Sequence, residues 1–243
     1  MRMIPFAKRC AKEVLRDPLN LIFGIGFPVV LLLLLSAIQA NIPVDLFEIA
    51  SLAPGIAVFG LSFMTLFSAT LIARDRESSL LQRLYTTPLK SHDFILGYLL
   101  PTIPIAIAQS TVSYLLAIIL GLPVSINILY AIIMILPVSV FFIALGLLCG
   151  SIFNVKQVGG ICGALLTNLS AWLSGVWFDL DLVGGAFGKI ANLLPFVHAV
   201  ELERAVISGN FTEGIPHLYP VLGYTLVTMA GAVYVFLHQM KKQ

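Results

Sequence analysis

Long apolar runs constrain the fold of this sequence more than any other feature. A helix needs about 20 apolar residues to cross the roughly 30 Å hydrocarbon core of a bilayer. Six stretches reach that length: Leu19–Ile38, Leu52–Ala73, Phe94–Leu120, Ile128–Gly150, Val158–Phe178 and Leu218–Leu237. Only helices and closed barrels satisfy all backbone polar groups in lipid, and the sequence lacks the short alternating strands of a barrel. We therefore predict an all-α membrane protein with six transmembrane helices.

Composition agrees with a single membrane domain over residues 1–243. Hydrophobic residues make up 59% of the chain and charged residues 11%, whereas soluble domains carry about a quarter charged residues. The formal net charge of +2 is too small to indicate a nucleic-acid partner. The three cysteines are odd in number and fall in cytoplasmic or membrane segments, so we predict neither a disulfide framework nor a metal site: Cys10, Cys149 and Cys162.

The distribution of charge predicts the orientation. Basic residues gather before the first span, between the second and third, and after the fourth and sixth: Arg2, Lys8, Arg9, Lys12, Arg16, Arg74, Arg76, Arg83, Lys90, Lys156, Lys241 and Lys242. The opposite side holds only Lys189 and Arg204 among several acids: Asp45, Glu48, Asp179, Asp181, Glu201, Glu203 and Glu213. The positive-inside rule then places both termini in the cytoplasm of a multi-pass protein of the plasma membrane.

The segment 1–18 is predicted to be an interfacial helix. Ile4, Ala7, Ala11 and Val14 recur at helical spacing, opposite three basic residues: Lys8, Lys12 and Arg16. This pattern is typical of a helix that lies in the membrane interface, and Pro18 would then mark the bend into the first span. A basic tail without helical structure is the alternative.

The six apolar cores carry no Asp, Glu, Lys, Arg or His. Ion-coupled carriers and proton relays keep ionisable groups near the middle of the membrane, so we do not expect this chain to be one. A membrane-embedded hydrolase needs a nucleophile beside a base, and the spans offer no such pair. If the chain transports a substrate, the energy has to enter from a cytoplasmic partner.

The cytoplasmic loop 74–93 is the first segment that indicates a partner. Four apolar residues share one face of a predicted short helix, which Pro88 ends: Leu80, Leu81, Leu84 and Tyr85. Glu77 and the arginines surround that face. An apolar stripe outside the membrane can lie on lipid headgroups or dock into a groove on another subunit.

The run from Glu77 to Leu89 resembles the coupling loop of type-2 ATP-binding-cassette (ABC) exporter permeases. That loop usually reads Glu-x-Gly-Thr-Leu-Glu-x-Leu and closes with Thr-Pro-Leu; this sequence departs from it at Ser79, Leu80 and Gln82. The resemblance implies a contact with an ABC nucleotide-binding (ATPase) subunit through six residues: Glu77, Leu80, Leu81, Arg83, Leu84 and Pro88.

A second segment is similar to the family's Pro-x-x-aromatic-x-x-acid-x-x-Arg pattern. Pro195, His198, Glu201 and Arg204 match it, with histidine at the aromatic position. Because Pro195 interrupts the helical pattern, we predict two short helices, Lys189–Leu194 and Val197–Ser208, in an outer re-entrant hairpin over 189–210. Glu201 and Arg204 would neutralise each other across one helical turn, and His198 is expected to be a hydrogen-bonding residue rather than a ligand. The resemblance implies that this hairpin gates the outer end of the path.

No Walker-type glycine loop occurs, so we expect no catalytic, metal or cofactor site in this chain, with ATP and Mg bound by the partner subunit. The resemblance implies a dimer with a second permease copy or paralogue. Phe59, Phe63 and Phe67, with Asn168, fit either helix packing or a path for a hydrophobic or amphiphilic drug, peptide, lipid or glycan. A non-transporting sensor or resistance subunit is the alternative function, followed by a membrane enzyme.

Overall fold

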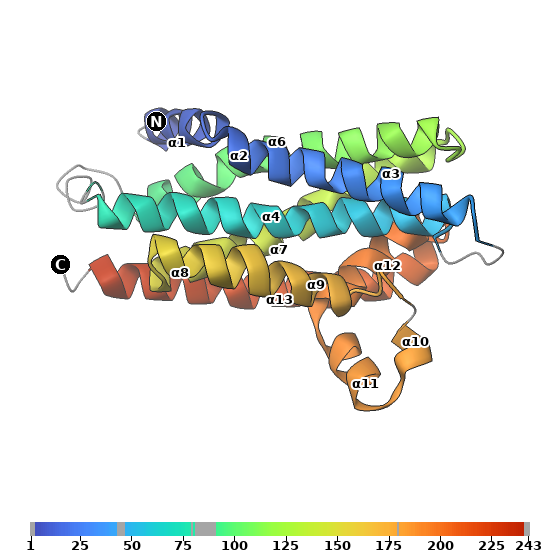
Figure 1. Ribbon diagram of the computed structural model, residues 1–243. Helices are drawn as coiled ribbons and strands as arrows, with labels where there is room; N and C mark the ends of the chain where they lie inside the picture. Colours follow the sequence, from blue (N-terminus) through green and yellow to red (C-terminus); the bar gives the residue numbers. More distant parts are fainter. Residues whose placement is uncertain (1–2, 43–46, 79, 81–90, 179, 241–243) are drawn as a thin grey trace.

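The computed structural model describes residues 3–42, 47–78, 80, 91–178 and 180–240, and no strand occurs among them (Figure 1). Five helical stretches in this part of the chain are long and apolar enough to cross a membrane: Ile22–Gln39, Ile49–Glu77, Asp93–Ile119, Ile126–Ile152 and Phe211–Gln239. Several charged residues used to predict the orientation lie outside the described residues: Arg2, Asp45, Arg83, Lys90, Asp179, Lys241 and Lys242. The all-helical membrane class is confirmed.

The predicted fifth span is the exception. Its sequence is helical from Val155 to Trp172, in three consecutive segments: α8 (Val155–Gly160), the π-helical η2 (Ile161–Leu166) and α9 (Thr167–Trp172). Lys156, Gln157 and Asn168 dilute its apolar character, and the chain turns after Trp172, six residues before the predicted end at Phe178. A count of six spans therefore stays a prediction.

The long helices extend beyond their predicted ends. The first span is α2 (Pro18–Leu21), η1 (Ile22–Gly26) and α3 (Phe27–Gln39); the others are α4 (Ile49–Glu77), α6 (Ser91–Ile119), α7 (Ile126–Ile152) and α13 (Phe211–Met240). Residues 74–77, predicted to belong to the cytoplasmic loop, form the last turn of α4. They are helical because α4 continues to find packing partners there, as Asp75 shows below.

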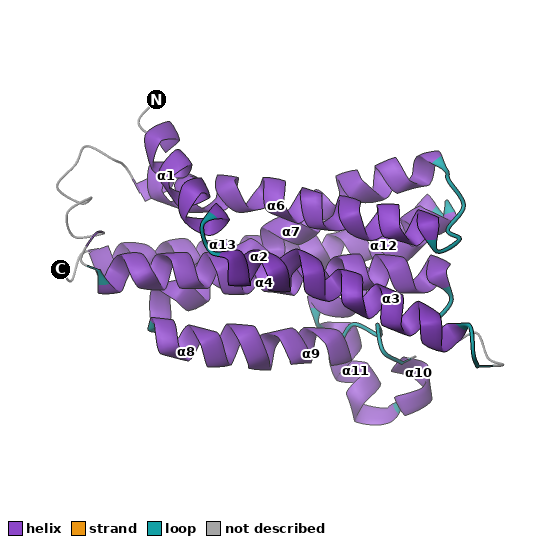
Figure 2. Cartoon of the chain, turned by 45° about the horizontal axis from the view of Figure 1, so that its top comes forward, coloured by secondary structure: helices purple, strands orange, loops and turns teal. Residues whose placement is uncertain are grey.

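Helix α4 forms the core of the bundle, since 94% of its most apolar window is buried. It packs against α3, α6, α7 and the segment α8–α9, which runs alongside it in both views (Figures 1 and 2). Glycine permits the closest approach: a Cβ on Gly146 of α7 would lie 2.5 Å from the carbonyl oxygen of Thr65, and one on Gly150 would lie 2.5 Å from that of Ala69. Any side chain there would push the two helices apart.

The outer segment that precedes α13 contains the predicted helix break. It comprises α10 (Leu180–Val183), α11 (Gly185–Leu193) and α12 (Pro195–Ser208). The break falls at Pro195 as predicted, but Pro195 is itself the first residue of α12, two residues before the predicted start at Val197. Gly209 ends that helix with a left-handed φ of 81°. Helix α12 packs against α4, α7 and α13, while α10 and α11 project from the side of the bundle (Figure 1).

Functional contacts divide between the two ends of the bundle. Helix α1 (Met3–Leu15), the end of α4, the start of α8 and the end of α13 lie at one end, which we call the α1 end (Figure 1). Helix α12 and the start of α4 lie at the other, the α12 end. The first and last described residues of the chain therefore lie at the same end, the arrangement that an even number of crossings requires.

Helix α1 is fixed to the bundle by a buried ion pair. Arg9 donates from Nη1 and Nη2 to the two carboxylate oxygens of Asp75 at 2.5 and 2.6 Å, and Tyr98 Oη donates to Oδ2 at 2.8 Å. The Asp75 side chain is 1% exposed. Phe6 adds an apolar contact, since a Cβ at Gly97 would lie 2.2 Å from its Cδ1.

The buried face of α1 differs from the predicted one. Phe6, Cys10 and Val14 are buried against the bundle, while Ile4, which was assigned to the apolar stripe together with Val14, is 41% exposed. The helix therefore has two apolar faces: one packs against the bundle, and the other, which includes Ile4, faces outward. The helix spans Met3–Leu15, within the predicted segment 1–18, and ends before Pro18; its position in the membrane interface stays a prediction.

We expect Asp75→Asn to release α1 from the bundle. Losing one charge of a buried pair costs about 3 kcal/mol here, the low end of the usual range because Arg9 is partly exposed. Cys10 reports the release: it is fully buried, and burial raises the pKa of its thiol to about 12, so it should react slowly with a maleimide. In a Cys149→Ala, Cys162→Ala background, Asp75→Asn should accelerate labelling by roughly tenfold to a hundredfold.

Arg74→Gln is the matched control, because Arg74 forms a more exposed pair with Asp17 at 3.2 Å. Exposed pairs contribute about 0–1 kcal/mol, so labelling of Cys10 should change little. Equal labelling rates in Asp75→Asn and Arg74→Gln would show that the buried pair does not hold α1.

Candidate functional site: the two ends of helix α4

The base of the predicted coupling loop is fastened to two other helices. Arg76 Nη1 donates to the carbonyl oxygens of Gly150 and Phe153, at 2.8 and 3.2 Å, and so binds the carboxyl end of α7. Glu77 Oε1 accepts a hydrogen bond from the backbone N–H of Val155, at 2.8 Å, at the amino end of α8. A cation at a helix C-terminus and an anion at a helix N-terminus both complement the helix dipoles. The last turn of α4 therefore holds the α7–α8 junction.

Of the six predicted coupling residues, the structure places two. Glu77 forms the contact above, and Leu80 is half-buried. Leu81, Arg83, Leu84 and Pro88 lie outside the described residues. The sequence predicts that Glu77 contacts a partner subunit. In the structure Glu77 accepts a hydrogen bond from Val155, so a displacement of the loop base would act on α8 as well as on α4.

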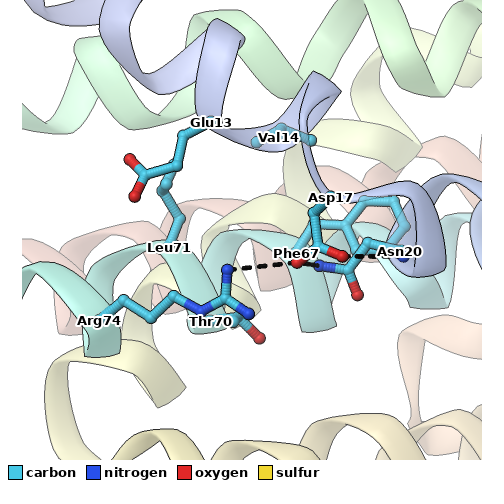
Figure 3. A pocket seen from close by; sticks show the side chains of 8 residues that line it. All are labelled: Glu13, Val14, Asp17, Asn20, Phe67, Thr70, Leu71 and Arg74. Atoms are coloured by element: carbon cyan, nitrogen blue, oxygen red, sulfur yellow. Dashed lines mark hydrogen bonds and ion pairs between the residues drawn. The ribbon is translucent and has the colours of Figure 1, made fainter.

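A small cleft separates α1 and α2 from α4 beside the buried ion pair (Figure 3). Asp17 bridges it, pairing with Arg74 across the cleft and accepting a hydrogen bond from Asn20 Nδ2 at 3.0 Å. Glu13 lines the same cleft and pairs with Arg9 at 2.6 Å. The contact with α4 thus combines an exposed pair, Asp17–Arg74, with the buried pair, Arg9–Asp75, and Glu13 adds a second acid beside Arg9.

At the α12 end, Arg204 joins three segments. Its Nη1 donates to Glu201 Oε1 at 2.8 Å, which confirms the predicted contact between these neighbours on one helical turn. Its Nε donates to the carbonyl oxygen of Ser51 at 3.2 Å and its Nη2 to that of Gly175 at 3.0 Å. Arg204 therefore ties α12 both to the first turn of α4 and to the turn after α9.

His198 links the outer helices to α13. Its Nε2 lies 2.9 Å from the carbonyl oxygen of Asn192, which can only accept, so Nε2 carries the proton. In the neutral ring Nδ1 is then an acceptor, and His217 Nδ1–H, 2.9 Å away, donates to it. Burial lowers the pKa of His198 and favours this neutral form. A hydrogen-bonding role, as predicted, matches this geometry.

Glu203 is a buried acid that sequence analysis missed. Tyr114 Oη donates to its Oε2 at 2.8 Å, while Oε1 has no partner among the described residues and the side chain is fully buried. Burial raises the pKa of Glu203 to about 8, and the hydrogen bond from Tyr114 lowers it by less. The carboxyl group is therefore neutral at pH 7.

A signal for Glu203 was present in the sequence. Phe196, Ala199, Val200 and Val206 recur at helical spacing along one face of α12, and Glu203 falls within that stripe. Glu201, two residues earlier, points to a different side because successive helical residues are 100° apart. The position of an acid within an apolar helical stripe indicates that it is buried. The side of the membrane on which the acid lies does not show this.

The three phenylalanines of the predicted substrate path are packed against other side chains in this structure. Phe59 and Phe63 are buried in an aromatic cluster with Phe27 and Trp177, and Phe67 packs over Gly24 of η1. Asn168 does not join them; it is exposed, and its amide donates to the carbonyl oxygen of Ala164 in its own helix. The packing alternative describes these phenylalanines here, and a path along them stays a prediction.

The helical bundle with its candidate spans defines a helical membrane domain. A family model described as ABC-2 type transporter matches residues 6–207. The chain therefore belongs to the ABC-2 type transporter family, whose members are membrane transport subunits associated with an ABC ATPase subunit. No curated protein matches the chain.

We expect the stability of the protein to fall as pH rises, because of Glu203. Its pKa is near 4.5 when unfolded and about 8 when folded, so the folded state holds one more proton across that window. Stability is then greatest below the unfolded pKa and declines up to the folded one, by about 1 kcal/mol per pH unit. The apparent midpoint of thermal unfolding in detergent, measured from pH 5.5 to 8.5, should show this decline.

Glu203→Gln should flatten the pH dependence, because the amide has the shape of the neutral acid and cannot ionise. Glu201→Gln is the control, since that residue is partly exposed and should leave the slope unchanged. If the midpoint of unfolding declined equally with pH in wild type, Glu203→Gln and Glu201→Gln, the titrating group would be a residue other than Glu203.

Proposed function

We propose that this chain is the transmembrane permease subunit of an ATP-driven exporter, which moves a hydrophobic or amphiphilic substrate out of the cytoplasm. The family match over residues 6–207 carries the proposal. Drugs, peptides, lipids and glycans are the candidate substrates. The apolar, uncharged interior of the long spans suits cargo of this kind, because a strongly charged molecule would be poorly solvated beside it.

Coupling to ATP hydrolysis follows from the contacts at the α1 end. A nucleotide-binding subunit, with ATP and Mg, would engage the segment 77–88. Movement of that segment would pull on Glu77 and Arg76, which bind α8 and α7, and on Asp75 one residue earlier, which binds α1. Three consecutive residues would thus pass one displacement to three helices.

Opening of the outer end would require the Arg204 contacts to change. Arg204 fixes α12 to α4 and to the turn after α9, so a rigid movement of α4 alters the distances that this side chain spans. Pro195, His198, Glu201 and Arg204 would then act as an outer gate. A second permease copy or paralogue would complete the path, with all termini in the cytoplasm and the complex in the plasma membrane.

A sensor or resistance subunit of an ABC complex is the second candidate. The packing of Phe59 and Phe63 against Phe27 and Trp177 favours it, because these side chains, which were predicted to line a path, are engaged in contacts within the bundle. The two functions differ in one measurement: an exporter moves a fluorescent amphiphile across a proteoliposome membrane when its ATPase subunit is supplied with ATP, and a sensor does not.

We expect Leu80→Asp with Leu84→Asp to abolish association with the ATPase subunit while leaving membrane insertion intact. Burying one leucine contributes about 1.5–3 kcal/mol, so two lost contacts weaken docking by on the order of a hundredfold or more. Co-purification of the two subunits from detergent extracts measures the loss. Lys156→Asp is the control, because it changes a charge on α8 at the same end of the bundle and leaves the sequence of the segment unchanged.

Full recovery of the ATPase subunit with the double variant would show that this loop is not the coupling element. Loss with Lys156→Asp as well would instead indicate a general electrostatic requirement at that end of the bundle.

We expect Arg204→Ala to reduce transport more than Glu201→Ala, with ATPase docking unchanged in both. Removing Arg204 removes all three hydrogen bonds, to Ser51, Gly175 and Glu201, whereas removing Glu201 leaves the arginine with its two carbonyl acceptors. Unsatisfied groups that are buried cost about 1–3 kcal/mol each, less where water reaches them. Efflux of a fluorescent amphiphile and co-purification of the ATPase subunit separate the two effects; equal efflux from both variants would contradict the role of Arg204 as the outer brace.

A further inference from the structure

An apolar groove of about 420 Å³ runs between α1 and α6 on the outward face of the bundle. Its walls are Ile4, Ala7 and Ala11 from α1 and Leu100, Pro101 and Pro104 from α6, and Lys8 lies at its edge. The groove is preformed, because the Arg9–Asp75 pair and the Phe6–Gly97 contact fix α1 against the bundle.

The surroundings of the groove belong to a lipid-facing surface. On α6, Leu96 and Leu100 are exposed, as are Leu115 and Ile119 further along, so the apolar wall continues along the span. In a bilayer such a surface is covered by hydrocarbon. An acyl chain can lie in the groove and continue along α6 without a break.

Helix α1 carries basic side chains that have no acidic partner among the described residues, and one of them, Lys8, lines the groove. Arg9 and Arg74 are neutralised by Asp75, Glu13 and Asp17. Lys8, Lys12 and Arg16 are exposed and form no ion pair in the part of the chain that the structure describes. The edge of the groove thus carries spare positive charge, complementary to a phosphate that has no neutralising ammonium group.

We propose that this groove is a binding site for a phospholipid with an anionic headgroup, one acyl chain lying against Ala11 and Pro104 and the headgroup phosphate bound by Lys8. The site goes beyond the permease function and does not depend on it, because the groove is lined by α1 and α6 and by no residue of α4. A bound lipid would extend the contact of α1 with the bundle beyond the Arg9–Asp75 pair.

Native mass spectrometry of the full chain tests the headgroup. Detergent-purified protein is equilibrated with phosphatidylglycerol and phosphatidylcholine of identical chains, and the retained lipids are counted. Wild type should retain phosphatidylglycerol preferentially, on the order of fivefold, the effect of one lysine near an anionic phosphate. Lys8→Glu should remove that preference, whereas Lys156→Glu, an equal charge change on α8, should keep it. Equal retention of both lipids by wild type, or equal effects of the two substitutions, would overturn the proposal.

Filling the groove tests the acyl chain. Ala11→Phe should displace the retained lipid, and Leu100→Phe gives a second filling variant on α6 that leaves α1 unchanged. Ala230→Phe is the matched control at an exposed alanine of α13. Slow maleimide labelling of Cys10 shows that α1 remains in place in each variant. Unchanged lipid retention in both filling variants would overturn the site. A change of oligomeric state without loss of lipid would also overturn it, and would assign the groove to a second copy of the chain.

Discussion

The buried ion pair between Arg9 and Asp75 is the contact on which the α1 end of this structure depends. A carboxylate in an apolar interior is tolerated only when its oxygens are satisfied, and Asp75 receives two hydrogen bonds from Arg9 and one from Tyr98. Asp75 therefore cannot be buried unless α1 is docked. In turn, the bidentate contact of Arg9 docks α1 in a defined register, because it permits little displacement. Both the cleft beside Asp17 and the groove above α6 exist because this contact fixes α1 in place.

Helix α4 connects the polar contacts at the two ends of the bundle. Its last turn binds α1, α7 and α8 through Asp75, Arg76 and Glu77, and its first turn accepts a hydrogen bond from Arg204 through the carbonyl oxygen of Ser51. Between them its surface is apolar and closely packed, with Thr65 and Ala69 in backbone contact with the glycines of α7. Close-packed interiors transmit displacement instead of absorbing it. A helix of this kind, fastened at both ends, is suited to carry a movement from one side of a membrane to the other.

Local features of this fold could be predicted from sequence, and contacts between distant segments could not. The long apolar helices, the break at Pro195 and the Glu201–Arg204 contact each depend on residues within a few positions of one another. Arg9 and Asp75 are separated by 66 positions, and Tyr114 and Glu203 by 89, so no spacing rule connects them. Counting charges by side missed the burial of both acids, because Asp75 was counted with the cytoplasmic loop and Glu203 with the outer side. The fifth span stays a prediction for a related reason: Asn168 lies within it, and Lys156 and Gln157 lie just before it in the same helical stretch, where they weaken its hydrophobic character.

The two buried acids meet the same constraint in opposite ways. Asp75 is paired with the guanidinium group of Arg9, whereas Glu203 has only the neutral hydroxyl group of Tyr114 as donor, and burial raises its pKa. An ion pair that joins a surface helix to the bundle resists sliding, since displacement would expose two charges to an apolar surface. A neutral carboxyl group imposes a smaller penalty when α12 shifts against α6, because only one hydrogen bond from Tyr114 has to break. The Arg9–Asp75 pair therefore fixes the register of α1 more strictly than the single Tyr114–Glu203 hydrogen bond fixes α12 against α6.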